Sequence, residues 1–179
     1  MRALDVTYNG YMRNSTHEGA RDFDFMCFHS PYNKLVTKAV GRCLYNDFVR
    51  DDASAPTATA EALAEWHPEK VDPTSTYADR ALETALKPLS APVYKAKCAP
   101  SAGLSKQIGN SYSGALYVNL AALCDSQRAG LEGKTTFMFS YGSGAIATAF
   151  SITARRPSDT QSPLFTCAHI GAALNLQVR

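Results

Sequence analysis

The stretch "FDFMCFHSPYNKLVTKAVGRCLYNDF" (residues 23–48) sets one strand and one helix on either side of a histidine. Residues 23–28 form a short apolar run with the length and composition of a buried strand. Pro31 follows, and its fixed φ suits the first turn of a helix. Beyond it, apolar residues recur at i, i+3 and i+4, which predicts an amphipathic helix. His29 is therefore expected at the C-terminal end of a strand, beside the start of a helix.

The next region, residues 51–105, is expected to be a peripheral insertion. It begins with small and acidic residues, and "HPEKVDP" (residues 67–73) then interrupts any regular element. The segment "TYADRALETAL" (residues 76–86) predicts a second, short helix that ends at Pro88, because proline lacks the N–H that continues a helix.

The C-terminal part of the chain predicts one helix and two strands. In "GNSYSGALYVNLAALCDS" (residues 109–126), Ser and Gly precede an apolar pattern, so a helix is expected to begin near Ser111. "TTFMFS" and "AIATAFSITA" are rich in strand-forming residues, and "YGSG" between them predicts a hairpin or a tight connection. The order of elements predicts an α/β domain with a mixed sheet over residues 1–154. Residues 155–179 lose periodicity and are expected to be a poorly ordered tail.

Composition narrows the classes of function. The chain of 179 residues is 45% hydrophobic and 19% charged, which is typical of a globular domain. Its net charge of +2 lacks the strong basic patch of a nucleic-acid-binding protein. No apolar run approaches the roughly 20 residues that cross a bilayer, so we expect neither nucleic acid nor a membrane as a partner. The five cysteines, an odd number without paired spacing, favour a reducing compartment.

Three polar residues lie where α/β sheets build their sites, at strand ends and helix N-termini: His29, Asn110 and Ser143. Lys34, Lys38 and Arg42 follow at successive i, i+4 positions of the predicted helix and would share one face. A polyanionic ligand such as a nucleotide-tailed carrier would suit that face. The alternatives are structural: His29 as a histidine that caps a buried strand, and the basic residues as a solvated face.

Other chemistries are disfavoured by spacing. Cys27 and His29 lie two apart on the predicted strand, and their parallel side chains are poorly arranged for proton transfer. "YGSG" lacks the Gly-Lys-Ser/Thr ending of a phosphate-binding loop, so its glycines are expected to permit close backbone approach instead. The remaining histidines have no metal-ligand spacing with any cysteine. We therefore expect no metal and no other cofactor.

The motifs nevertheless resemble one known family. The segments "FHSPYNKLVTK" (residues 28–38), "GNSYSGALYVNLAAL" and "LEGKTTFMFSYGSGAIATAFSI" are similar, in that order, to the C-terminal half of eukaryotic hydroxymethylglutaryl-CoA synthase. The likeness covers roughly residues 3–153. It implies the thiolase-like fold, in which two similar halves pack their sheets back to back around a buried layer of helices. Only the second half is matched, as a mixed sheet flanked by helices.

The resemblance implies roles for five residues. His29 would hold the acetoacetyl-CoA carbonyl beside an acetylated cysteine, and Lys34 and Lys38 would lie along the CoA. Asn110 and Ser143 would be the other substrate contacts. Acetyl-CoA and acetoacetyl-CoA would then be substrates that condense to hydroxymethylglutaryl-CoA in the mevalonate and isoprenoid pathway. Donors fixed around the developing oxyanion suit this reaction.

The resemblance also implies what lies elsewhere. In the family, the nucleophilic cysteine and the glutamate base belong to the N-terminal half, and none of the five cysteines here has the nucleophile's context. We therefore expect the isolated chain to be inactive, with that N-terminal half as its partner and a homodimer as the complete enzyme. The alternative is a non-catalytic fragment that binds CoA or a full-length subunit. A ketoacyl synthase that uses a carrier protein is disfavoured by "FHSPYNKLVTK". The cytoplasm is the expected compartment, with the mitochondrion as the alternative.

Overall fold

A three-stranded mixed sheet forms the centre of the protein, with strands in the order β1-β2-β3. The computed structural model describes residues 1–51, 53–142 and 144–155. β1 pairs with β2 in parallel, and β2 pairs with β3 antiparallel. The predicted α/β class, the mixed sheet and the hairpin are thereby confirmed. The strands are β1 Phe25–Phe28, β2 Thr135–Gly142 and β3 Ile146–Thr153.

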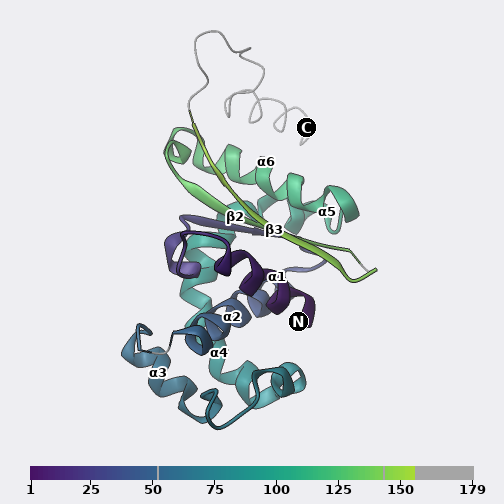
Figure 1. The fold of residues 1–179 in the computed structure, drawn as a ribbon. Coiled ribbons are helices and arrows are strands. Elements are labelled where there is room, and N and C mark those ends of the chain that lie inside the picture. The colour runs from purple at the N-terminus through teal and green to yellow at the C-terminus, as the bar shows by residue number, and fades with distance from the viewer. Residues whose placement is uncertain (52, 143, 156–179) are drawn as a thin grey trace.

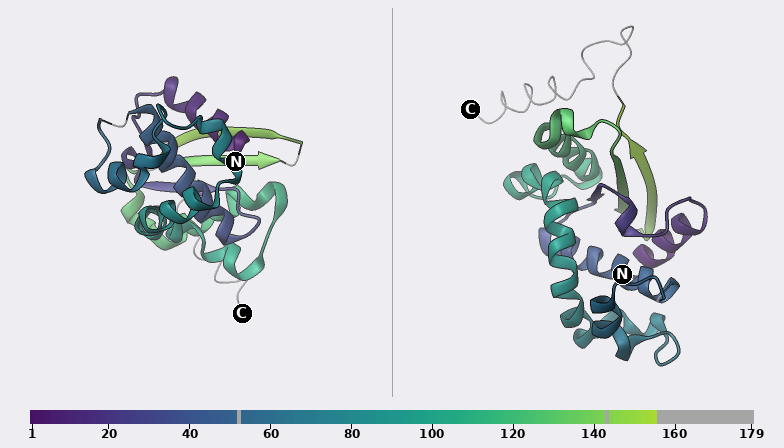
Figure 2. Two further views of the ribbon diagram at one scale, coloured as in Figure 1. Left: turned by 90° about the horizontal axis from the view of Figure 1, so that it is seen from below. Right: turned by 90° about the vertical axis from the view of Figure 1, so that its left-hand side faces the viewer.

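Helices cover both faces of this sheet (Figures 1 and 2). α1 and α2 lie on one face, whereas α5 and α6 lie on the other. α3, η2 and η3 lie beyond α2, away from the sheet, and α4 leads back toward the sheet, where η4 contacts β1. The helices are α1 Arg2–Arg13, η1 Ala20–Asp22, α2 Asn33–Arg50, α3 Thr57–Leu63, η2 Ala64–Trp66, η3 Pro73–Ala78, α4 Arg80–Val93, the π-helix η4 Tyr94–Cys98, η5 Ala99–Ser101, α5 Gly103–Ile108, η6 Tyr112–Gly114, α6 Ala115–Gln127 and η7 Arg128–Leu131.

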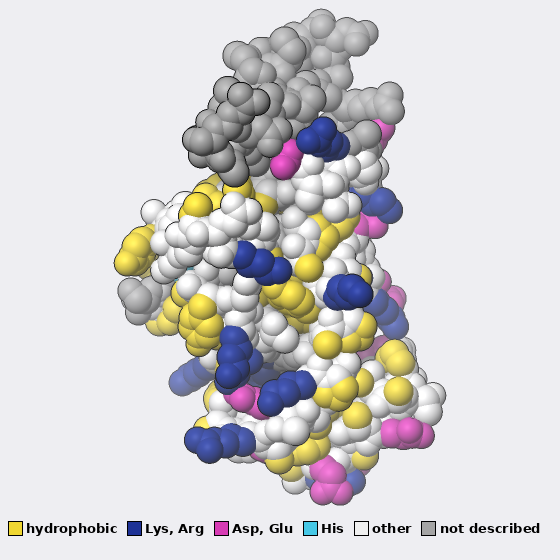
Figure 3. Space-filling model, turned by 180° about the vertical axis from the view of Figure 1, so that it is seen from behind, with side chains coloured by type: hydrophobic (Ala, Val, Ile, Leu, Met, Phe, Trp, Pro, Cys, Tyr) yellow, Lys and Arg dark blue, Asp and Glu magenta, His cyan; other side chains and the backbone are white. Residues whose placement is uncertain are grey.

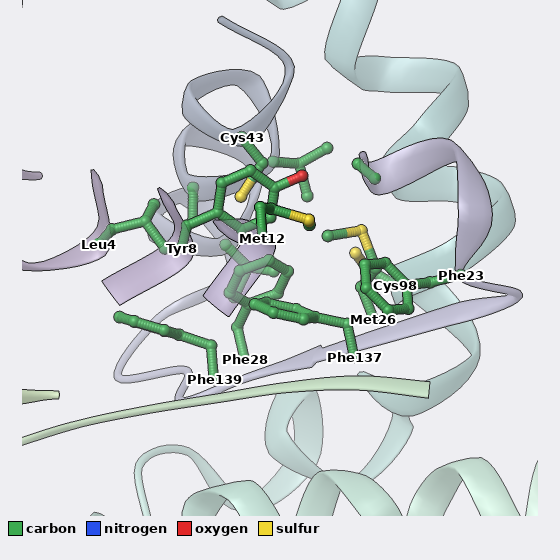
Figure 4. Packing of buried hydrophobic residues seen from close by; sticks show 14 residues of the cluster. Leu4, Tyr8, Met12, Phe23, Met26, Phe28, Cys43, Cys98, Phe137 and Phe139 are labelled. Atoms are coloured by element: carbon green, nitrogen blue, oxygen red, sulfur yellow. The ribbon is translucent and has the colours of Figure 1, made fainter. Parts of the chain in front are cut away.

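Alternating side chains of β1 and β2 build two separate cores, because successive residues of a strand point to opposite faces. Phe28, Phe137 and Phe139 face α1 and α2, where they pack with Tyr8 in the larger core (Figure 4). Met138 faces α6 instead and belongs to the smaller core. The apolar run of β1 is therefore explained by burial on both faces.

α1 is an element that the sequence analysis did not identify. Leu4, Tyr8 and Met12 recur every four residues and are buried, which gives this helix one apolar face. The Tyr8 hydroxyl also donates to Asp47 Oδ1 of α2 at 2.8 Å. The side chain of Asp47 accepts the Ala20 backbone N–H at the same distance. α1 and the η1 turn are thus both held by one carboxylate of α2.

The expectation that the helix of residues 76–86 ends at Pro88 is wrong. α4 begins at Arg80, where Asp79 Oδ1 accepts the backbone N–H groups of the first turn, and it continues through Pro88 to Val93. A proline costs a helix one hydrogen bond, but packing along an apolar face can offset that loss. Leu82, Leu86 and Ser90 form such a face against α2.

Residues 51–105 contribute to the interior as well as to the surface. Leu63, Leu82 and Leu86 form a third core with Tyr45 and Phe48 of α2. Cys98 lies in the larger core beside the sheet. The interpretation of this region as an insertion stays a prediction, and the structure adds that its second part packs into the core.

The helix predicted after Pro31 is confirmed as α2, which begins at Asn33. The helix predicted near Ser111 is confirmed as the turn η6 followed by α6. The expected tail lies outside the described residues, apart from exposed Arg155. Among the described residues, no helix has the length and apolar character that would cross a membrane.

Candidate functional site

His29 directly follows β1, as its place in the sequence predicts. Its backbone N–H donates to the Phe139 carbonyl oxygen at 2.7 Å, which extends the β1–β2 ladder by one residue. Beyond it, Ser30 is buried and α2 begins three residues later. The chain thus turns from strand to helix at the histidine, and the imidazole lies at the carboxyl end of the parallel strand pair, where α/β sheets bind ligands.

An open pocket of about 830 Å³ lies in front of this strand end. Its wall combines segments that are far apart in the sequence: the beginning of α1, the end of β1, α2, and both strands of the β2–β3 hairpin. Phe28, Leu35 and Ala147 supply apolar surface, whereas His29 and Tyr141 supply polar groups. A mostly apolar pocket with a few convergent polar groups is the usual form of a small-molecule site.

Burial lowers the pKa of His29 below its ordinary value, because removal from water penalises the charged imidazolium. At neutral pH the ring is therefore uncharged, with one nitrogen as donor and the other as acceptor. Such a ring can donate its N–H to an oxygen in the pocket and can accept a proton at the second nitrogen. Both abilities suit a reaction in which charge develops on an oxygen.

Lys34 and Lys38 line a second, smaller pocket of about 100 Å³ between α2 and α4. Met1 borders this pocket and the His29 pocket alike, so the two are neighbours. Lys38 Nζ lies 2.7 Å from Glu83 Oε1 of α4, and both side chains are more than one third exposed. Lys34 is exposed. On the face shown in Figure 3, several Lys and Arg side chains lie near one another at the lower left, and others are scattered among hydrophobic patches.

The expectation that Arg42 is solvated like the two lysines is wrong, although Arg42 borders the same pocket as they do, so a shared ligand-binding face stays a prediction. Its side chain is 5% exposed, and Nη2 lies 2.6 Å from Asp5 Oδ2 of α1. Nη1 donates to Thr76 Oγ1 at 2.7 Å, and the guanidinium group lies between the rings of Tyr45 and Tyr77. The i, i+4 spacing is correct, but α1 and the η3 turn cover this end of the helix face.

Asn110 lies outside the His29 pocket, on the loop before α6. Its Oδ1 accepts the Tyr112 backbone N–H at 2.9 Å, which leaves the amide NH₂ as the group that can bind a ligand. Two residues of this loop have the left-handed backbone conformation, with φ of +79° at Gly109 and +49° at Tyr112. Ser143 lies outside the described residues, although Tyr141 and Ala145 on either side of it border the His29 pocket. The substrate-binding roles of Asn110 and Ser143 stay predictions.

The buried cysteines are unsuited to nucleophilic catalysis. Burial raises the pKa of Cys27 to about 12 and also raises the pKa of Cys43 and of Cys98 above the ordinary thiol value. These three thiols stay protonated at neutral pH. A dyad of Cys27 with His29 is therefore disfavoured by the charge state of the thiol as well as by the strand geometry.

Two residues of this region were not singled out from the sequence. Tyr141 is the last residue but one of strand β2 and borders the His29 pocket. Asn119 is buried on α6 and donates to the Phe28 carbonyl oxygen at 2.9 Å. The available signal was a single amide within an apolar helical stripe, between Leu116 and Leu123, because such an amide needs a buried partner.

The solved structures that resemble this one share its architecture. MvaS in complex with 3-hydroxy-3-methylglutaryl coenzyme A aligns with a TM-score of 0.66 and 24% identity, over 98% of this chain and 37% of that one. The HMG synthase of the curacin biosynthetic pathway, in complex with acetyl donor-ACP, aligns with a TM-score of 0.58 and 19% identity over 99% of this chain. At these identities the likeness establishes the fold, which is one C-terminal half of the thiolase-like class.

Sequence comparison identifies the family. The family model "Hydroxymethylglutaryl-coenzyme A synthase C terminal" matches residues 1–179. Hydroxymethylglutaryl-CoA synthase A of Dictyostelium discoideum is 42% identical over 161 residues, which cover 87% of this chain and 32% of the relative. The cytoplasmic synthase of Homo sapiens is 35% identical and the mitochondrial synthase of Sus scrofa 32% identical, over 85% and 92% of this chain. The chain belongs to the hydroxymethylglutaryl-CoA synthase family and corresponds to its C-terminal region, spanning about a third of the length of these relatives.

Proposed function

We propose that this chain is the acetoacetyl-CoA-binding part of a hydroxymethylglutaryl-CoA synthase. The observation that carries the proposal is the position of His29, whose uncharged imidazole borders a large, mostly apolar pocket at the strand end. The family membership supplies the reaction class, which is condensation of acyl-CoA thioesters.

In the proposed reaction, the enolate of an acetyl thioester attacks the ketone carbon of acetoacetyl-CoA. A carbon–carbon bond forms, the carbonyl π bond breaks, and its electron pair becomes an alkoxide. His29 would donate a hydrogen bond to that oxygen as charge develops and then pass its N–H proton to the alkoxide while its second nitrogen takes a proton from water. Hydrolysis of the thioester bond to the enzyme would then release the product. One such donor contributes about 3 kcal/mol to lowering the barrier.

The acetyl-carrying thiolate must come from elsewhere in this scheme. The three buried cysteines have raised pKa values, and Cys124 of α6 borders neither the His29 pocket nor the lysine pocket, so we assign the nucleophile and the general base to a part of the enzyme other than the residues described. We therefore expect no hydroxymethylglutaryl-CoA from the purified chain supplied with acetyl-CoA and acetoacetyl-CoA. Measurable turnover would contradict this assignment.

We also propose a cytoplasmic location and a homodimeric complete enzyme. The buried thiols of Cys27, Cys43 and Cys98, which form no disulfide, suit a reducing compartment.

Lys34 and Lys38 are proposed to lie along the CoA tail, since their pocket adjoins that of His29. Substrate thioesters would then span two neighbouring pockets, with the reactive carbonyl at the histidine.

The test places this segment in a complete synthase, for example by joining it to the N-terminal part of the Dictyostelium discoideum relative, and changes His29 to Ala. Acetylation of the enzyme, followed with labelled acetyl-CoA, should persist, whereas condensation should fall by roughly 100-fold. His67→Ala serves as the control, because the His67 ring packs against Phe48 of the third core and borders neither pocket. Equal losses in acetylation and condensation would show that His29 does not have this role.

A further inference from the structure

A buried amide of α6 lies behind the candidate catalytic histidine. Asn119 is 3% exposed, and its Nδ2 uses two donor bonds, one to the Phe28 carbonyl oxygen at 2.9 Å and one to Ser30 Oγ at 2.7 Å. The two acceptors belong to the residues on either side of His29. The amide therefore spans the histidine from the α6 side of the sheet, and Asn119 is not itself among the residues that border the pocket.

The peptide unit that carries His29 is held at both of its polar ends. Its carbonyl oxygen, that of Phe28, accepts from Asn119 of α6, and its N–H, that of His29, donates to the Phe139 carbonyl of β2. Ser30 Oγ provides a third contact, just beyond the histidine. With the backbone fixed from the helix layer and from the sheet, rotation about the side-chain torsions is the main freedom left to the imidazole.

The presence of Asn119 at this position lowers the stability of the fold. Its Oδ1 is buried and has no hydrogen-bond partner among the described residues. An unpaired buried acceptor is unfavourable, and an apolar side chain of similar volume would avoid it. An uncompensated polar atom of this kind is expected where the group serves placement rather than stability. The amide cannot be turned over either, because Oδ1 would then face the Phe28 carbonyl.

We propose that Asn119 is a positioning residue for His29, an amide clamp from α6 that fixes the backbone from which the imidazole projects and thereby the burial of the ring. The clamp itself is a statement about geometry, whereas its catalytic importance rests on the function proposed above for His29. Loosening it should let water reach the ring, which would return the pKa of His29 toward its ordinary value and make the ring more accessible.

The test uses the full chain at sub-micromolar concentration and the acylating reagent diethyl pyrocarbonate, which reacts with uncharged imidazole. Mass spectrometry of the labelled peptides follows each histidine separately, and the rate against pH gives the titration midpoint of each. Wild-type His29 should show a midpoint below the ordinary value of about 6.5. In Asn119→Leu, which keeps the volume but not the donors, the midpoint should rise and the rate at high pH should increase about fivefold.

Two further variants keep the result interpretable. Leu123→Ala, a fully buried residue of the same helix, destabilises the smaller core without touching either acceptor, and it should leave the His29 midpoint unchanged. Ser30→Ala removes one contact of the clamp and should shift the midpoint in the same direction by a smaller amount. If Asn119→Leu unfolds, so that all histidines react at one rate, Ser30→Ala decides the matter.

The proposal is overturned if the folded Asn119→Leu variant, or Ser30→Ala in its place, labels His29 as wild type does, or if Leu123→Ala produces the same shift. A separate measurement concerns the function: acetoacetyl-CoA added to wild-type protein should slow the labelling of His29 and leave that of His67 unchanged. Absence of protection would count against the proposed function while leaving the clamp intact, so the two ideas fail separately.

Discussion

The first turns and the middle of α2 show how one helix can serve structure and binding with the same residue types. At its first turns, Lys34 is exposed and Lys38 makes a half-exposed pair with Glu83. One turn further on, Arg42 lies under α1 and η3 with a bidentate partner, Asp5. The spacing of the three cations is regular, and their surroundings are not.

The difference teaches that burial, and not residue type, decides what a cation does. A buried guanidinium is costly to leave without its partner, so the pair of Arg42 with Asp5 ties α1 to α2. A solvated ammonium contributes little to stability and remains available to an anionic ligand. The C-terminal half of α2 is accordingly the anchor of the fold, whereas its N-terminal turns border both pockets.

The largest effect is expected in the buried middle of α2, at Arg42. Arg42→Ala should lower the free energy of unfolding by about 3–5 kcal/mol, because it leaves the Asp5 carboxylate buried without its partner. Denaturant unfolding followed by circular dichroism measures the change. In the double variant Asp5→Leu with Arg42→Met, both charges are replaced and most of the loss should disappear. A loss under about 1 kcal/mol in the single variant would place this pair with the surface pairs.

A smaller loss of stability is expected where the residue before η1, Gly19, approaches Asp47 in the last turns of α2. A Cβ at Gly19 would lie 2.8 Å from Asp47 Oδ2, and that oxygen is fixed because it accepts the Ala20 N–H. Gly19→Ala should therefore cost about 1–3 kcal/mol in thermal or denaturant unfolding. Gly103→Ala is the control, since a Cβ there meets nothing within 4 Å. Equal stabilities of the two variants would contradict the close contact.

In the first turns of α2, where the two lysines are accessible, the expected effects concern ligand binding. Lys34→Ala should weaken CoA binding about threefold and reduce its dependence on salt, because one screened charge contact is lost. Lys38→Ala should have a smaller effect, since Glu83 already neutralises this charge, and Glu83→Gln should strengthen binding about twofold. Calorimetric titrations at several salt concentrations measure all three. Unchanged affinity in every variant would indicate that these lysines form only a solvated face.

The smallest effect is a pH dependence that arises from His29. Because burial lowers its pKa in the folded state, the folded protein favours the uncharged ring. Its contribution to stability is present above the unfolded-state pKa of about 6.5 and is lost as the pH falls through the folded-state value. Wild type should thus lose more stability than His29→Asn between pH 7.5 and pH 5 in urea unfolding. Parallel curves for the two proteins would exclude a lowered pKa.

Local pattern was sufficient for most of the elements around the site. The apolar run before His29 and the i, i+3, i+4 pattern after it predicted β1 and α2, and the glycine-rich segment after Ser140 predicted the hairpin. α1 was not identified, because its apolar positions are few and separated by polar residues. The end of α4 was misplaced at Pro88, because the packing of this helix on α2 overrides the local preference of proline.

What the sequence by itself determined is the set of elements, the strand-to-helix turn at His29 and the family motifs around it, since these depend on residues near one another in the chain. Only the tertiary structure decided which polar groups meet. It buried Arg42 under α1 and η3 while Lys34 and Lys38 beside it stayed accessible, and it brought Asn119, 90 residues away, behind His29. The physical reason is that burial and pairing depend on contacts between distant segments, which helical spacing does not specify.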